Sequence, residues 1–169
     1  GPEPSFLARH PGGRVLYAAN EVGAWEGRPT GAVSEFAVDP ATGALALLGR
    51  RASGGGAPCW IAVDRAGRHA LVANYVGGSV AVLPIAPDGS LGEATAVVRH
   101  EGRGPDPARQ DAPHAHCIVP DPTGRWALAA DLGIDRILVY RLDAAAGTLA
   151  PAPTPFAALP PGSGPRHLA

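Results

Sequence analysis

Short apolar runs separated by turn residues recur along the whole chain. Three of these runs are copies of one turn-plus-strand pattern, spaced 54 and 57 residues apart. The copies are GRVLYAAN from Gly13, GRHALVAN from Gly67 and GRWALAAD from Gly124. Because each run is short, bounded by turn residues and without a sustained period of 3.6, the pattern predicts β-strands rather than helices.

Each copy lies inside a larger repeat with a fixed order of elements. A run opened by Pro4, Pro58 or Pro113 precedes the Gly-Arg turn, and an alternating run follows it. The repeats close on the stretches DPATGAL, APDGSL and DAAAGTL, whose Gly, Asp and Pro residues are typical of hairpin turns. Four short strands in a period of roughly 50 residues predict a four-stranded antiparallel meander, the blade of a β-propeller.

We therefore predict an all-β fold with blades at about 4–57, 58–112 and 113–164, and the start of a fourth blade at 165–169. Closed propellers have roughly four to eight blades. We expect the chain to be part of a longer protein, or several copies to complete a ring. The open blade edges are expected to favour self-association.

Composition narrows the classes of partner. A chain of 169 residues with 46% apolar content is predicted to form one soluble globular domain. The net charge of -1, with no basic stripe, argues against a nucleic-acid partner. No apolar run is long enough to cross a membrane and no signal-peptide layout is present, so we expect no membrane partner. Cys59 and Cys117 are predicted to be free thiols in a reducing compartment, which favours the cytoplasm.

The meander predicts where the chemically active residues gather. The starts of the first strands and the ends of the second strands should lie on one face, at the mouth of the central channel. The residues there are His114, His116, Arg166 and His167 at the openings of first strands, and Glu21, Tyr75 and Asp131 at or just past the ends of second strands. The other copies carry Ser5-Phe6 and Cys59-Trp60 opposite the two histidines, so the scaffold does not require imidazoles.

Two histidines separated by one residue on an extended strand should point to the same side. An imidazole titrates near pH 6.5, so His114 or His116 could serve as a general base while the other orients it or binds substrate. Arg166 could clamp an anion or pair with Asp131. The histidines could instead satisfy backbone groups, or bind a metal with His167 and Glu21, although the spacing matches no zinc signature.

The connection from Arg99 to His116, RHEGRGPDPARQDAPHAH, is longer and more polar than its counterparts. Long loops of this kind are functional or disordered. Arg103 and Arg109 could bring positive charge to the mouth, or be merely solvated. We count Arg109, with Glu21, His167 and Asp131, among the candidate substrate-binding residues.

Four segments resemble the lactonase-type seven-bladed propellers: GRHALVANYVGGSVAVLPIAPDGSLGEA, HEGRGPDPARQDAPHAHC, DLGIDRILVYRLDAAAGTLAPA and LPPGSGPRHLA. That family includes propeller-type bacterial 6-phosphogluconolactonases and is similar to the fungal 3-carboxymuconate lactonizing enzyme. The resemblance implies a cofactor-free site at one mouth, with His114 or His116 as general base or acid and Arg166 binding an anionic substrate. It also implies that this chain corresponds to the first half of a family member, with Trp60 where a histidine is expected.

The expected activity is hydrolysis of 6-phosphoglucono-lactone to 6-phosphogluconate in the oxidative pentose phosphate route. A histidine would activate water, and Arg166 with Arg109 would hold the phosphate or the developing oxyanion. The chain alone is expected to be inactive. Two alternatives stay open: addition of a carboxylate across a muconate double bond by the same groups, and a propeller that only binds.

Overall fold

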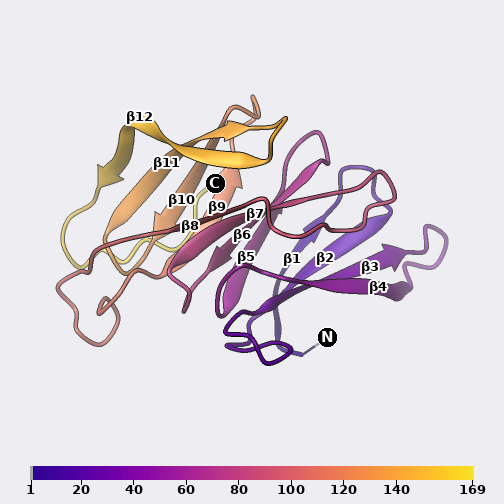
Figure 1. The fold of residues 1–169 in the computed structure, drawn as a ribbon, viewed down its shortest axis with the longest axis horizontal. Helices are drawn as coiled ribbons and strands as arrows, with labels where there is room; N and C mark the ends of the chain where they lie inside the picture. Colours follow the sequence, from indigo (N-terminus) through magenta and orange to yellow (C-terminus); the bar gives the residue numbers. More distant parts are fainter. Residues whose placement is uncertain (1) are drawn as a thin grey trace.

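The computed structural model describes residues 2–169 and contains three four-stranded antiparallel sheets, each with its strands in chain order (Figure 1). Blade one contains β1 (Pro4–Arg9), β2 (Val15–Asn20), β3 (Ala32–Val38) and β4 (Leu45–Ala52). Blade two contains β5 (Pro58–Val63), β6 (His69–Asn74), β7 (Ser79–Pro84) and β8 (Ala96–Arg99). Blade three contains β9 (Ala115–Pro120), β10 (Trp126–Asp131), β11 (Arg136–Asp143) and β12 (Thr148–Ala158). The all-β blade architecture predicted from the repeat is confirmed.

Blade two is buried on both faces, because it lies between the other two blades (Figure 1). One core joins it to blade one, where Tyr17 packs near Val72 and Leu83. A second core joins it to blade three through Val80 and Tyr140, among others. Alternate residues of each strand thus serve opposite faces of the sheet, which explains why β6 is buried along its whole length.

The repeated Gly-Arg turn has a conformational cause. Gly13, Gly67 and Gly124 adopt φ angles of 74°, 68° and 69°. These values lie in the left-handed region, which glycine enters without the steric penalty of a Cβ atom. The glycine of the repeat therefore marks a backbone requirement that all three blades share.

Every first strand contains a β-bulge near its start. The bulges show which residues of the three repeats are structurally equivalent, and this differs from the alignment made on the sequence. In β1 the pairing to β2 skips Ser5, in β5 it skips Cys59, and in β9 it skips His116. His116 is thus equivalent to Ser5 and Cys59, and the alignment that began the third copy at Pro113 was wrong by two residues. His114 precedes β9, so simple alternation along one strand does not orient the two imidazoles.

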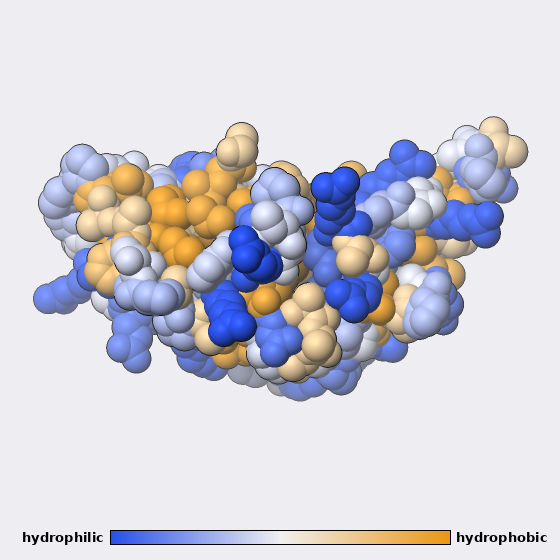
Figure 2. All heavy atoms as spheres, turned by 90° about the horizontal axis from the view of Figure 1, so that it is seen from above, coloured by the Kyte–Doolittle hydropathy of each residue, from blue (hydrophilic) through white to orange (hydrophobic). Residues whose placement is uncertain are grey.

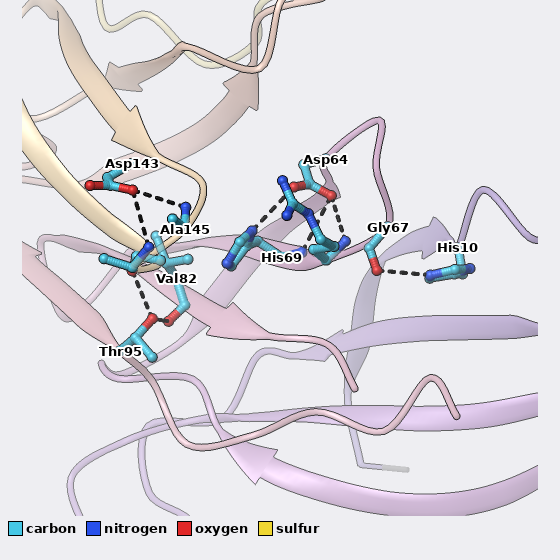
Figure 3. A network of polar contacts seen from close by, with 11 residues as sticks. His10, Asp64, Gly67, His69, Val82, Thr95, Asp143 and Ala145 are labelled. Carbon is cyan, nitrogen blue, oxygen red and sulfur yellow. Dashed lines mark hydrogen bonds and ion pairs between the residues drawn. The ribbon is translucent and has the colours of Figure 1, made fainter. Parts of the chain in front are cut away.

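Polar contacts connect the blades on the face opposite the first-strand starts (Figure 3). His10 Nδ1 accepts from the Gly12 amide at 3.0 Å, so its Nε2 carries the proton and donates to the Gly67 carbonyl at 3.0 Å. Thr95 of blade two donates to the Gly147 carbonyl of blade three at 2.7 Å. These bonds hold neighbouring blades in register away from the candidate residues.

The outer side of blade three is an uncovered apolar surface, seen as an orange area in Figure 2. Trp126, Leu128, Val139 and Phe156 line a hollow of about 580 Å³ there. Closed propellers cover such a face with the next blade, so we do not place the functional site in this hollow. Self-association through open blades stays a prediction.

The tail at 165–169 forms no strand, although its sequence resembles the start of a fourth blade. A strand needs a hydrogen-bonded neighbour, and none of residues 2–169 pairs with this segment. The same residues contain no helix that could cross a bilayer.

Glu35 is a buried carboxyl in blade one. It is 2% exposed, and its Oε1 has no hydrogen-bond partner within residues 2–169. Burial raises the pKa of this carboxyl, and a hydrogen bond from the Leu91 backbone, together with the Arg51 charge, offsets the effect only in part. The folded protein therefore binds a proton at Glu35 more tightly than the unfolded chain does.

We expect Glu35→Gln to flatten the pH dependence of stability above pH 4.5, the ordinary pKa of this group. Below that pH the carboxyl is neutral in both states, whereas above its raised pKa the folded chain must bury a charge, so stability is lost as pH rises. Urea midpoints between about pH 4 and pH 7 measure this, with the exposed Glu93→Gln as control. Equal slopes for wild type and Glu35→Gln would contradict the assignment.

Candidate active site

The bulged residues of the first strands lie at one face of the blades, and each contacts the segment that follows around the channel. Ser5 Oγ lies 3.4 Å from the Pro58 carbonyl, and Cys59 Sγ lies 3.5 Å from the His116 carbonyl. His116 continues the series, because its Nε2 lies 3.0 Å from Arg166 Nη1. The repeat therefore places one side chain per blade at this mouth, and blade three places an imidazole.

His116 is half-buried and in contact with a cation. A guanidinium only donates hydrogen bonds, so Nε2 of His116 is the unprotonated acceptor and Nδ1 carries the proton. Nδ1 is buried and has no partner within residues 2–169. Burial lowers the pKa of His116, and the charges of Arg166 and His167 lower it further. The ring is thus held neutral, the form that can accept a proton.

His114 is bound to the scaffold. Its Nδ1 lies 3.0 Å from the Tyr75 carbonyl and its Nε2 lies 3.3 Å from Asp111 Oδ1. The ring stacks on Tyr75, with centroids 4.4 Å apart and an angle of 10° between planes. Because both ring nitrogens face acceptors, His114 has less freedom than His116 to take a proton from a substrate.

Arg166 and Arg109 line one hollow of about 250 Å³ at this mouth. The other lining residues are Asp106, Gln110, Leu132, Gly162, Ser163 and Gly164. The charge of Arg109 also contributes, weakly, to the lowered pKa of His116. The long 99–116 loop and the segment before Arg166 thus bring two guanidinium groups to one cavity, as an anion site requires.

Asp131 does not face the mouth, contrary to the prediction that it binds substrate. It is fully buried, and its Oδ2 lies 2.6 Å from His100 Nδ1. Its Oδ1 accepts from the backbone amides of His114 and Gly133 at 2.8 and 2.9 Å. The alternative pairing of Asp131 with Arg166 is also wrong, because His100 occupies that carboxylate. Asp131 therefore holds the backbone of His114.

The repeat contained a signal for this structural role. The residues equivalent to Asp131 are Asn20 and Asn74, which are also fully buried. Asn20 accepts from Ser34, and Asn74 donates to the Ser53 carbonyl. A polar residue at the end of every second strand is therefore part of the scaffold.

Glu21 and His167 lie close to the mouth. Burial raises the pKa of the Cys59 thiol to about 12, with a further contribution from the Glu21 charge and an opposing one from Arg166. The His167 ring is 5.2 Å from both His116 and Trp60, measured between centroids.

Within residues 2–169, no group of three or more His, Cys, Asp or Glu side chains is arranged to hold a metal ion.

Aromatic rings form a wall beside the site, and of these rings the sequence placed only that of Tyr75 at the mouth. Phe6 stacks on Trp60 at 3.9 Å between centroids, and Trp60 contacts His167. Tyr75 contacts His116 edge-on at 5.9 Å. Phe6 and Trp60 each follow a bulged residue, so their shared place in the repeat was the signal that could have assigned them to the mouth.

Comparison of the sequence and the structure with known proteins shows the family of this chain. A family model described as Lactonase, 7-bladed beta-propeller, matches residues 1–169. The chain belongs to this family. The 6-phosphogluconolactonase of Bacillus subtilis is 34% identical over 98% of the chain and 45% of its own length. That of Formosa agariphila is 27% identical over 97% of the chain and 46% of its own length.

Solved structures agree with the family assignment. The periplasmic gluconolactonase of Pseudomonas aeruginosa superimposes with a TM-score of 0.88 at 36% identity, over 97% of this chain and 47% of that one. The chain thus spans about half the length of the lactonase-family relatives that it matches. The cytoplasmic location predicted from the cysteines is not established, because this relative is named as periplasmic.

Proposed function

We propose that the full-length protein hydrolyses a lactone that carries an anionic group, as a 6-phosphogluconolactonase does, at the mouth formed by His116 and Arg166. The observation that supports this most is the 3.0 Å contact between His116 Nε2 and Arg166 Nη1. It joins a neutral imidazole to a cation that an anionic substrate would attract. The names of the lactonase-family relatives support the same reaction class.

In the proposed mechanism, the phosphate of the substrate takes hydrogen bonds from Arg166 and from Arg109, which lines the same hollow. Arg166 then releases Nε2 of His116. The freed nitrogen accepts a proton from water while the water oxygen bonds to the lactone carbonyl carbon. The bond between that carbon and the ring oxygen breaks, and the proton passes from His116 to the ring oxygen. The product is the open-chain acid.

Two features favour His116 over His114 as the base. The pKa of His116 lies below its usual value, chiefly because the ring is buried, so the basic form persists at neutral pH. His114, in contrast, has both nitrogens directed at Tyr75 and Asp111. We assign His114 the task of shaping the wall next to His116.

Steady-state turnover of three substrates by the full-length protein tests this function. The substrates are 6-phosphoglucono-lactone, unphosphorylated glucono-lactone and 3-carboxymuconate. We expect the highest kcat/KM for the phosphorylated lactone, because only it presents a phosphate to Arg109 and Arg166. Conversion of the muconate alone would instead establish a cycloisomerase, and conversion of none would favour a binding platform.

We also propose that the protein is located in a reducing cellular compartment. Cys59 and Cys117 are buried and free, which favours a reducing compartment such as the cytoplasm.

A further inference from the structure

Asp135 has a backbone conformation that is unusual for a residue other than glycine. Its φ angle is 54°, in the left-handed region, and the equivalent residue in blade two is Gly78 with a φ angle of 53°. The shared turn thus favours glycine, and an aspartate there carries a steric cost. Its side chain can be expected to compensate for that cost.

The carboxylate of Asp135 accepts three hydrogen bonds from two distant segments. Oδ2 accepts from the Gly162 amide at 2.7 Å, and Oδ1 accepts from the Gly164 amide and from Gln110 Nε2, each at 2.8 Å. Successive backbone amides in such a bend form a concavity suited to an anion. Asp135 is 6% exposed, and its lowered pKa results from these bonds, which outweigh the opposing effect of burial.

Gln110 extends the contact into the long loop. Its Nε2 also donates to the Leu132 carbonyl at 2.8 Å, and its Oε1 accepts from the Asp106 amide at 3.2 Å. Gln110 itself is 2% exposed. The turn between β10 and β11, the 99–116 loop and the segment before Arg166 are therefore joined at one carboxylate.

Both arginines of the hollow lie next to this junction in the chain. Arg109 precedes Gln110, and Arg166 follows Gly164 by two residues, with Pro165 between them. The hydrogen bonds of Asp135 reach Gln110, Gly162 and Gly164, so they connect the carboxylate to both arginines through the backbone. A change at Asp135 should alter where the two cations lie while leaving both of them present.

We propose that Asp135 is a positioning residue that sets the separation of Arg109 and Arg166, and so shapes the cavity that receives the anionic group of the substrate. This inference rests on the proposed lactone hydrolysis. It adds a residue that touches neither substrate nor the reacting atoms.

The test uses Asp135→Gly in the full-length protein. Glycine is compatible with the fold, because Gly78 adopts the same φ in blade two. The matched control is Asp143→Asn at the other end of β11, where the carboxylate also accepts from two backbone amides, those of Ala145 and Ala146. Asp135→Asn keeps an oxygen acceptor and serves as the conservative variant.

We expect Asp135→Gly to raise KM for 6-phosphoglucono-lactone at least tenfold with kcat within about threefold, since the binding cations move and His116 stays. We expect Asp135→Asn to be intermediate and Asp143→Asn to leave KM unchanged. Amide hydrogen exchange at Gly162 and Gly164 should accelerate only in the Asp135 variants.

The outcomes separate the two proposals. If the wild type does not hydrolyse the lactone, the proposed function fails and the positioning role fails with it. If the wild type is active and Asp135→Gly leaves KM unchanged, only the positioning role is overturned. Unchanged exchange at Gly162 and Gly164 would likewise overturn it.

Discussion

Replacing His116 by Ser is expected to lower kcat for lactone hydrolysis by about 10²- to 10⁴-fold in the full-length protein, the range for loss of a general base. The substitution places in blade three the residue that occupies the bulge of blade one, Ser5. The scaffold therefore tolerates it. The change removes the proton acceptor and keeps Arg166, so kcat should fall far more than KM rises.

Steady-state kinetics and thermal unfolding of the same preparation measure this prediction. His114→Gln is the control, because His114 is bound to Tyr75 and Asp111 and is expected to affect kcat by less than about tenfold. A loss of kcat larger for His114→Gln than for His116→Ser would transfer the role of base to His114. A fall of less than tenfold for both would remove histidine from the mechanism.

Replacing Arg166 by Gln is expected to raise KM for the phosphorylated lactone by about tenfold or more, because a hydrogen bond to a charged group such as the phosphate contributes about 1.5–3 kcal/mol. The same change should move the acid limb of kcat/KM. Arg166 lowers the pKa of His116, so the wild-type limb lies below pH 6.5, the ordinary value, and removal of the charge shifts it upward.

Steady-state kinetics over a range of pH, which give KM as well as kcat/KM, measure both effects in one experiment. Arg103→Gln is the control, since Arg103 lies in the same long loop and does not line the hollow. An unchanged acid limb in Arg166→Gln would show that another group controls the titration. A KM equal to that of the wild type would show that the substrate anion binds elsewhere.

The fold could be predicted from the sequence because its determinants are local and repeated. Gly13, Gly67 and Gly124 occupy the same left-handed turn, and the apolar runs around them alternate with the pleat of a sheet. Three copies of one four-strand pattern predict the repeated blades of a β-propeller. The bulges were not visible in this way, because one extra residue in a strand changes pairing without changing hydrophobicity.

The candidate site could be predicted only in part. The gathering of His116 and Arg166 at one face follows from strand order, whereas their direct contact depends on the bulge that turns His116 toward the next segment. Asp131 was misassigned because its partner His100 is 31 residues away, beyond the reach of a local pattern. The asparagines at the equivalent positions carried the missing information.

Asp135 shows how a departure from the repeat can indicate function. Gly78 and Asp135 share one backbone conformation, which glycine adopts at the lowest steric cost. The carboxylate of Asp135 bonds to two distant segments, which a glycine at this position could not do. Its partners, Gly162, Gly164 and Gln110, lie at least 25 residues away along the chain, so a local pattern could not identify them.

A crystal structure of the full-length protein with bound 6-phosphogluconate tests the central claim most directly. We predict phosphate oxygens within hydrogen-bond distance of Arg109 and Arg166, Nε2 of His116 released from Arg166, and the product carboxylate beside that ring. Product bound away from this mouth, or bound there with the contact between His116 and Arg166 intact, would contradict the account.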